Sequence, residues 1–291
     1  MKQNSFRAWL LASRPKTLTG AMVPVVVALA LATTHRCFAL DALPAVLCLL
    51  FAVLMQVDAN FVNDYFDWRR GNDDEATRFG PLRACSQGWV TPRAMVVAMV
   101  LTTVLACVVG LPLGCYGGWG MVLVGVACVV FCILYTTTLS YIALGDVLVL
   151  VFFGIVPVCA TFYLQCGEVT SGVFVVSCAV GLCVDTLLIV NNYRDAANDQ
   201  RDGKRTLVVV VGLERGPGMY LWLGVLAAVL LLSVVGFKPV GVLLMAVYLF
   251  MHVSAYRRMK RLEGRDLNLV LGATARNILV FGVLAAAAIL V

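Results

Sequence analysis

Two short polar clusters contain the residues whose types and spacing could do chemistry, and each follows a long apolar run. The first reads NFVNDYFDWRRGNDDEATRFGPLR over residues 60–83, and the second reads NNYRDAANDQRDGKR over residues 191–205. Both combine carboxylates and amides with basic side chains. Such a mixture is suited to binding a metal ion together with an anion.

The acidic residues of each cluster fall on one face of a helix. If a helix continues out of the first apolar run, Asn60, Asp64 and Asp67 lie at i, i+4 and i+7. The second run continues into a similar stripe, which consists of Asn191, Asp195, Asp199 and Asp202. Carboxylates this close repel one another unless a cation lies between them, and Mg²⁺ takes oxygen ligands while keeping waters and substrate phosphates. The two stripes therefore predict a metal-bridged diphosphate.

Basic residues accompany both stripes and would supply the remaining positive charge. They are Arg78, Arg83, Lys204 and Arg205. Arginine binds phosphate oxygens bidentately, whereas lysine acts as a point charge. We therefore expect these four residues to bind the anionic substrate.

Solvation of loops is the competing explanation for charges at such positions. We favour it for the run Asp73, Asp74 and Glu75. An acid in the middle of a bilayer costs on the order of 2.5–3.5 kcal/mol, and membrane acids are usually functional. A chemical role is therefore favoured for Asp64, Asp67, Asp195 and Asp199. Asp58 and Asp185 lie deeper and could pair with a basic group, stay protonated or face an aqueous cavity.

The elements that must position these clusters are membrane helices. The 291-residue chain is 62% hydrophobic and 13% charged, with a mean hydropathy of +0.94, which is far from the composition of a soluble domain. Spans of about 20 apolar residues fall near 18–34, 43–63, 94–113, 119–139, 144–165, 171–192, 219–236, 239–256 and 269–290. We predict an all-α polytopic membrane protein with nine transmembrane helices in one bundle, as a single domain over 1–291, with an interfacial helix before the first span.

The placement of lysine and arginine predicts the orientation. Of the 22 basic residues, nineteen lie in the N-terminal segment or in the second–third, sixth–seventh and eighth–ninth connections. Arg36 and Lys238 lie on the opposite side, and Arg276 lies within the last span. The N-terminus should therefore be cytoplasmic and the C-terminus outside, with a cavity that faces the cytoplasm. The net charge of +6 is explained by the lipid bilayer and an anionic ligand, without nucleic acid.

A repeated motif relates the two clusters. Asn60-x-x-x-Asp64 and Asn191-x-x-x-Asp195 are 131 residues apart, and each ends an even-numbered span. We interpret this as an internal pseudo-repeat around 43–139 and 171–256. Repeats also occur in transporters, but transporter charges lie near the midplane, whereas these cluster at the ends of the spans.

The chain resembles the UbiA superfamily of intramembrane prenyltransferases, and within it the branch that prenylates 1,4-dihydroxy-2-naphthoate in menaquinone synthesis. The resemblance covers nearly the whole chain and includes WLLASRPKTLTGAMVPV, NFVNDYFDWRRGND, RFGPLR, LGDVLVLVFFG, NNYRDAANDQRDGKRTL and ATARNILVFGVL. GPLR and LGD…FFG are more specific to this branch than the aspartates. Other aromatic acceptors, such as 4-hydroxybenzoate, homogentisate or a porphyrin, are disfavoured by GPLR.

This resemblance implies a reaction and a location. Mg²⁺ on Asp64 and Asp67 from one cluster and on Asp195 and Asp199 from the other would bind a polyprenyl diphosphate, with Asp202 as a further ligand. Loss of diphosphate would leave an allylic cation, which the naphthoate ring attacks with release of CO₂. The remaining substrate-binding residues would be Asn60, Asn63, Tyr141, Asn191 and Asn192. The implied location is the bacterial cytoplasmic (inner) membrane.

The chain departs from the superfamily pattern at several positions. An aspartate is usual four residues after Asp67, where this chain has Gly71, and the branch shifts that acid to the position of Asp73. TTTLSYIA lacks an expected basic residue, and Asp146 replaces a glutamate. Because GPLR is both basic and branch-specific, we predict that Arg83 holds the carboxylate of the aromatic acceptor.

Overall fold

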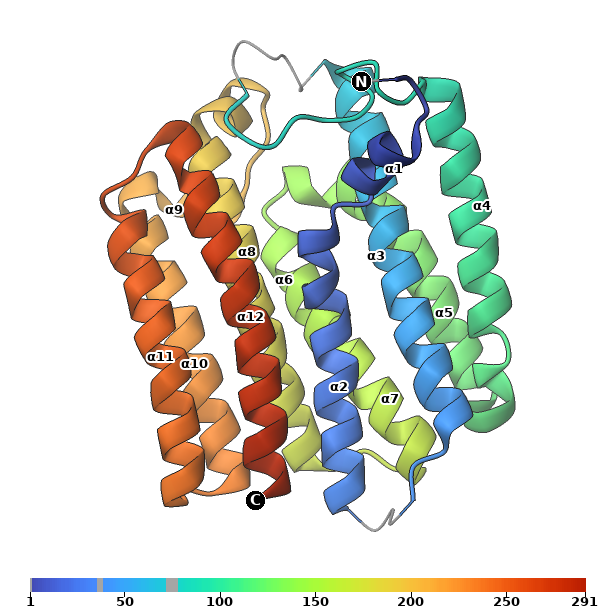
Figure 1. Cartoon of the computed structure of the whole chain (residues 1–291), viewed down its shortest axis with the longest axis vertical. Coiled ribbons are helices and arrows are strands. Elements are labelled where there is room, and N and C mark those ends of the chain that lie inside the picture. Colours follow the sequence, from blue (N-terminus) through green and yellow to red (C-terminus); the bar gives the residue numbers. More distant parts are fainter. Residues whose placement is uncertain (1, 36–38, 72–77) are drawn as a thin grey trace.

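The computed structural model describes residues 2–35, 39–71 and 78–291. Arg36, Asp73, Asp74 and Glu75 therefore lie outside the described residues. Within the described ranges, nine helical segments are long and apolar enough to cross a membrane, and the single β-bridge joins Ile142 to Arg205. The predicted all-α bundle of nine membrane helices is confirmed (Figure 1).

The helices follow one another with short connections, except for residues 71–91 between α3 and α4. In chain order they are α1 (Phe6–Ala12), η1 (Pro15–Thr17), α2 (Leu18–Thr34), α3 (Ala42–Arg70), α4 (Pro92–Gly110), α5 (Leu113–Thr137), η2 (Leu139–Tyr141), α6 (Gly145–Leu150), η3 (Val151–Ile155), α7 (Val156–Cys166), α8 (Ser171–Arg201), α9 (Leu207–Val211), η4 (Leu213–Arg215), α10 (Gly216–Val235), α11 (Pro239–Met259), η5 (Gly264–Asp266) and α12 (Leu267–Leu290). The η elements are 3₁₀-helices except η3, which is a π-helix.

The two helices that bear the acidic clusters are much longer than the spans predicted for them. α3 has 29 residues and α8 has 31. At about 1.5 Å per residue, each exceeds the roughly 30 Å thickness of a bilayer core. The predicted spans end at 63 and 192 because the apolar composition ends there, but the polar residues that follow continue the helices. The last turns of α3 and α8 can therefore present the acidic clusters beyond the hydrocarbon.

The two helices end at different kinds of cap residue. α3 ends at Gly71, whose left-handed backbone (φ 75°) is the usual glycine C-cap. α8 ends at Arg201, and Asp202 is its C-cap residue. Asp202 therefore directly follows the last residue of the helix, and its backbone N–H still donates to the Asn198 backbone oxygen at 2.9 Å. That it shares the face of Asp195 and Asp199 stays a prediction.

A π-helical segment joins α6 to α7 within one membrane span and packs closely against α8. A Cβ atom added to Gly154 of η3 would lie 2.5 Å from the backbone oxygen of Ser177, and one added to Gly181 of α8 would lie 2.9 Å from the backbone oxygen of Leu150. Only glycine permits backbones this close. Single π-turns are frequent at functional sites, and this one contains Phe152 and Phe153, which line the cavity described below.

One end of the bundle contains the polar connections. Figure 1 shows the N-terminus, α1, residues 78–90 and the connection after α8 at that end, with the C-terminus at the opposite end. This separation agrees with the one-sided distribution of lysine and arginine, while the assignment of the polar end to the cytoplasm stays a prediction. The main apolar core lies among α2, α7, α8, α10, α11 and α12 and includes Phe162, Leu231, Tyr248 and Phe281.

Candidate functional site

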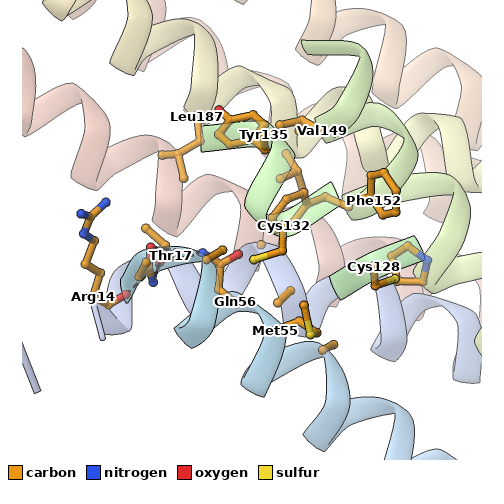
Figure 2. A pocket seen from close by; sticks show the side chains of 18 of the residues that line it. Arg14, Thr17, Met55, Gln56, Cys128, Cys132, Tyr135, Val149, Phe152 and Leu187 are labelled. Carbon is orange, nitrogen blue, oxygen red and sulfur yellow. Dashed lines mark hydrogen bonds between the residues drawn. The ribbon is translucent and has the colours of Figure 1, made fainter. Parts of the chain in front are cut away.

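A cavity of about 620 Å³ lies between α2, α3, α5, η3, α7 and α8. Its apolar walls include Phe51, Met121, Phe131, Phe152 and Phe153. Its polar lining residues include Arg14, Lys16, Thr17, Gln56, Asn60, Asn63, Arg78, Arg83, Tyr135, Thr161, Asn191, Arg194 and Asn268. Figure 2 shows Arg14, Thr17 and Gln56 near one another on one side, with Cys128 and Phe152 on the other. The cavity therefore joins an apolar chamber to a basic, amide-rich region.

Asp64, on α3, is engaged by the backbone of a distant segment. Its Oδ2 accepts a hydrogen bond from the N–H of Ala84 at 2.9 Å, and its Oδ1 accepts one from the N–H of Cys85 at 2.8 Å. The Asp64 residue is only 1% exposed. Its carboxylate thus satisfies two buried backbone donors and ties α3 to residues 78–90, which we call the strap.

Asp67, one turn further along α3, forms an ion pair with the strap. Nη2 of Arg83 lies 2.7 Å from Oδ2 of Asp67, and both side chains are largely buried. The strap is therefore attached to α3 through both Asp64 and Asp67. Arg83 also lines the cavity, so the ion pair lies at the cavity's edge.

Arg194 connects the second cluster to the other end of the strap. It makes a bidentate contact with Asp195, at 2.9 Å from Nε and 2.6 Å from Nη2. Its Nη1 donates to Asn268 of α12 at 2.9 Å, and Asn268 in turn donates to the backbone oxygen of Phe79 at 2.8 Å. A Cβ atom on Gly80 would lie 2.7 Å from Nη2 of Arg194, so glycine permits this approach. The strap therefore extends between α3 and the α8–α12 pair.

Asp199 lies one turn beyond Asp195 and faces Lys204. Nζ of Lys204 lies 3.8 Å from Oδ1 of Asp199, and the Lys204 backbone N–H donates to the Asp199 backbone oxygen at 2.7 Å. Oδ2 of Asp199 is buried without a hydrogen-bond partner. Asp202 lies 3.7 Å from Arg201, measured from Oδ1 to Nε. Of the second cluster, Asp199 thus has an oxygen available to a ligand.

The remaining candidate residues have different surroundings. Asn63 accepts a hydrogen bond from the Thr136 hydroxyl at 2.6 Å, Asn191 accepts one from Arg194 at 2.7 Å, and both line the cavity. Asn192 is buried in α8. The backbone oxygen of Tyr141 accepts from the N–H of Arg205 at 3.2 Å, and the Arg70 guanidinium lies 4.6 Å from the Tyr141 ring centroid. Tyr141 and Arg205 therefore join two polar connections outside the cavity lining.

Three deeper carboxyl groups stand apart from the strap. Asp58 accepts a hydrogen bond from the Thr103 hydroxyl at 2.9 Å, so it pairs with a neutral group and not a basic one. Asp146 and Asp185 are both buried, and buried oxygens of each have no hydrogen-bond partner.

Comparison with known proteins identifies the family. The chain matches the model of the UbiA prenyltransferase family over residues 21–271. The chain belongs to the UbiA prenyltransferase family. Together with its nine apolar helical segments, this makes it an integral membrane protein.

Curated relatives and solved structures agree with this assignment. A 1,4-dihydroxy-2-naphthoate octaprenyltransferase of Escherichia coli K12 is 38% identical over 71% of this chain and 69% of its own length. One of Mycobacterium tuberculosis H37Rv is 35% identical over 79% of this chain and 80% of its own. The apo structure of a UbiA homolog from Aeropyrum pernix K1 superposes with a TM-score of 0.71 at 15% identity, covering 92% of this chain and 96% of that one. A UbiA homolog from Archaeoglobus fulgidus, solved with GPP and Mg²⁺, superposes with a TM-score of 0.67 at 15% identity, covering 98% of this chain and 100% of that one.

The arrangement of this UbiA-family site fits a cation that takes few protein ligands. Among the described residues, no three acidic, histidine or cysteine side chains are close enough to surround a metal. Mg²⁺ usually takes one or two carboxylates and retains waters and substrate phosphates, so a closed cage is not required. The unpartnered Oδ2 of Asp199 and the oxygen donors Asp67 and Asp195 suit such a cation.

Several residues of the site were missed by reasoning from the sequence. They are Arg14, Gln56, Arg194 and Asn268. Arg194 follows directly from its position beside Asp195 and could have been found. Arg14 lies in WLLASRPKTLTGAMVPV, which belongs to the family resemblance but suggested no role for Arg14 itself. Gln56 and Asn268 lie within or at the start of membrane spans, where a polar residue was itself a usable signal.

Proposed function

We propose that the protein transfers a polyprenyl group from a polyprenyl diphosphate to 1,4-dihydroxy-2-naphthoate, with release of diphosphate and CO₂. The observation that supports it most directly is an apolar cavity of about 620 Å³ that continues into a basic region. Two arginines of that region pair with acids at the ends of α3 and α8, Arg83 with Asp67 and Arg194 with Asp195. The acceptor is chosen from the relatives, which are named for this substrate and are 33–38% identical over most of the chain.

The cavity suits an allylic cation and its leaving group. The apolar walls would exclude water, which would otherwise capture the cation. The basic residues near the strap would hold the negative charge that develops on the diphosphate, and such prearranged charges are effective in a water-poor site. Arg78 lines this region, and burial lowers the pKa of its guanidinium while nearby Asp195 raises it.

We propose Asp67, Asp195 and Asp199 as the protein ligands of Mg²⁺. Bound there, the ion would neutralise the leaving diphosphate. Asp64 and Asp202 are weaker candidates, because Asp64 accepts two backbone hydrogen bonds and Asp202 lies at the end of α8. Asn63, Asn191 and Lys204 would orient the diphosphate, with Asn192, Arg205 and Tyr141 supporting the connections around it.

We further propose that the polar end faces the cytoplasm of a bacterial inner membrane. The support is the concentration of lysine and arginine in the connections at that end. A soluble diphosphate product could then leave directly into the cytoplasm.

The test is product analysis with purified protein in lipid nanodiscs. Mg²⁺, a labelled polyprenyl diphosphate and one acceptor at a time would be supplied, and mass spectrometry would identify the product. We expect a prenylated naphthalene diol that lacks the carboxyl group. A product that keeps the carboxyl group, or preferential prenylation of 4-hydroxybenzoate, would contradict the proposal.

A further inference from the structure

Arg14 occupies an unusual backbone conformation between α1 and η1. Its φ of 48° and ψ of 69° place it in the left-handed region, which is rare for residues other than glycine and is found where the surroundings impose it. Thr17 holds the turn, since its N–H and hydroxyl donate to the Arg14 backbone oxygen at 2.9 Å and 3.0 Å. Asn60 of α3 donates to the backbone oxygen of Ser13 at 2.9 Å and to the Thr17 hydroxyl at 3.0 Å. The turn is thus fixed to α3 on both sides of Arg14.

The turn directs Arg14 to the cavity. Arg14 lines it, and the buried Nη2 of its guanidinium has no hydrogen-bond partner. Arg194 of the lining differs in this respect, because its Nη2 donates to Asn191 and Asp195. A buried guanidinium N–H without a partner is unfavourable by itself. It is therefore suited to receive an anionic group of a ligand.

Gln56 provides a complementary group close by. Its Nε2 donates to the Thr17 hydroxyl at 3.3 Å, so the same turn orients it. Its Oε1 is buried without a hydrogen-bond partner, and the residue lines the cavity. Figure 2 shows Gln56 beside Thr17, with Arg14 on the same side of the cavity. The turn therefore presents one unpaired donor and one unpaired acceptor to the same space.

We propose that Arg14 and Gln56 form the binding site for the aromatic acceptor. The guanidinium of Arg14 binds the carboxylate of a hydroxy-aromatic acid, and Oε1 of Gln56 accepts a hydrogen bond from a ring hydroxyl. A carboxylate requires such a partner in an apolar cavity, where an unpaired charge is strongly disfavoured. This inference rests on the proposed function, because it assigns the acceptor of that reaction to a place.

A phosphate could supply the same oxyanion chemistry, so the test compares both sources. Equilibrium binding to the protein in nanodiscs would be measured for 1-hydroxy-2-naphthoate, 4-hydroxybenzoate and inorganic pyrophosphate with Mg²⁺. Two further ligands each lack one group: 1-naphthol lacks the carboxylate, and 2-naphthoate lacks the hydroxyl. The variants are Arg14→Gln, Arg14→Lys and Gln56→Leu. Arg7→Gln is the matched control, because Arg7 is an exposed arginine of α1.

We expect each variant to lose affinity only for the ligands that carry the group recognised by the replaced side chain. Arg14→Gln should weaken the binding of 1-hydroxy-2-naphthoate and of 2-naphthoate about ten- to a hundredfold, as for a lost hydrogen bond to a charged group. The affinity for 1-naphthol should stay within about twofold of the wild type. Gln56→Leu should weaken the hydroxyl-bearing ligands and spare 2-naphthoate. Arg14→Lys should recover part of the carboxylate binding, and neither Arg7→Gln nor any of these variants should change pyrophosphate binding.

Several outcomes would overturn the assignment. If Arg14→Gln weakens pyrophosphate as much as the naphthoates, Arg14 belongs to the diphosphate site. If it weakens 1-naphthol equally, its effect is general, and Gln56→Leu then decides independently whether the turn recognises the hydroxyl. If the wild-type protein prefers 4-hydroxybenzoate, the proposed function is wrong, while loss of that acid in Arg14→Gln would still support the subsite. If the wild-type protein binds no aromatic acid, both the proposed function and the subsite assignment are wrong.

Discussion

Asp64 accepts a hydrogen bond from the backbone N–H of Cys85 at 2.8 Å, across 21 residues of chain. With the neighbouring bond from Ala84 at 2.9 Å, it makes the Asp64 carboxylate an anchor for the strap. The sequence predicted the same carboxylate to be a metal ligand. The two roles have different experimental consequences. Loss of an anchor should loosen the strap, whereas loss of a metal ligand should raise the Mg²⁺ concentration needed for activity.

Asp64→Asn should loosen the strap. The amide retains one acceptor oxygen and directs an NH₂ group at a backbone donor, with an expected loss of about 1.5–3 kcal/mol. Burial raises the pKa of the Cys85 thiol, and the nearby charge of Asp64 raises it further. Because only the thiolate reacts, Cys85 should label slowly with N-ethylmaleimide in the wild type and faster in Asp64→Asn, as read by site-resolved mass spectrometry. Unchanged labelling would argue against the anchor.

Asp67→Asn is the matched comparison. Loss of the Asp67 carboxylate should raise the Mg²⁺ concentration needed for half-maximal activity. The rate of Cys85 labelling should increase little, because both backbone hydrogen bonds to Asp64 remain. Asp195→Asn and Asp199→Asn should act in the same direction as Asp67→Asn. Near-normal activity at limiting Mg²⁺ in one variant from each helix would contradict a metal shared between α3 and α8.

Arg83→Ala should impair use of the polyprenyl diphosphate. The sequence had suggested that Arg83 binds the acceptor carboxylate, but its ion pair with Asp67 at 2.7 Å favours the metal and diphosphate region. We expect the KM for the diphosphate to rise about tenfold or more, as Lys204→Ala should also do, with a smaller rise for the naphthoate. Steady-state kinetics with each substrate varied in turn would measure this. A larger effect on the naphthoate would restore the original assignment.

Gly154→Ala should destabilise the bundle. The added methyl would meet the Ser177 backbone oxygen at 2.5 Å, and backbone cannot move aside as a side chain can. Overpacking of this kind costs about 1–3 kcal/mol. Gly120→Ala is the control, because nothing lies within 4 Å of its added Cβ. Thermal unfolding in detergent should separate the two variants, and equal stability would mean that η3 and α8 are not so tightly packed.

The orientation can be tested by reporters at the two ends of the bundle. A reporter fused after Val291 should be active only outside the cytoplasm, whereas a label introduced in the connection that follows α8 should react only from the cytoplasm. Both are expected from the distribution of lysine and arginine. The reverse pattern would invert the membrane topology while leaving the fold unchanged.

The sequence by itself determined the membrane bundle and the position of its chemistry. Hydropathy and segment length are local properties, and a bilayer admits few alternatives to helices of about 20 apolar residues. The shared face of Asn60, Asp64 and Asp67, at i, i+4 and i+7, likewise follows from helix geometry alone. The end of α3 could also have been predicted more accurately, because Gly71 is a recognisable C-cap.

Only the tertiary structure decided which partners those residues take. Asp64 and Asp67 have equivalent chemistry in the sequence, yet one meets backbone amides and the other meets Arg83. Arg14 and Gln56 are 42 residues apart and are brought to one cavity by the hydrogen bonds of Thr17 and Asn60. Such pairings depend on the path of the connections and the packing of distant helices, and neither periodicity nor composition records them.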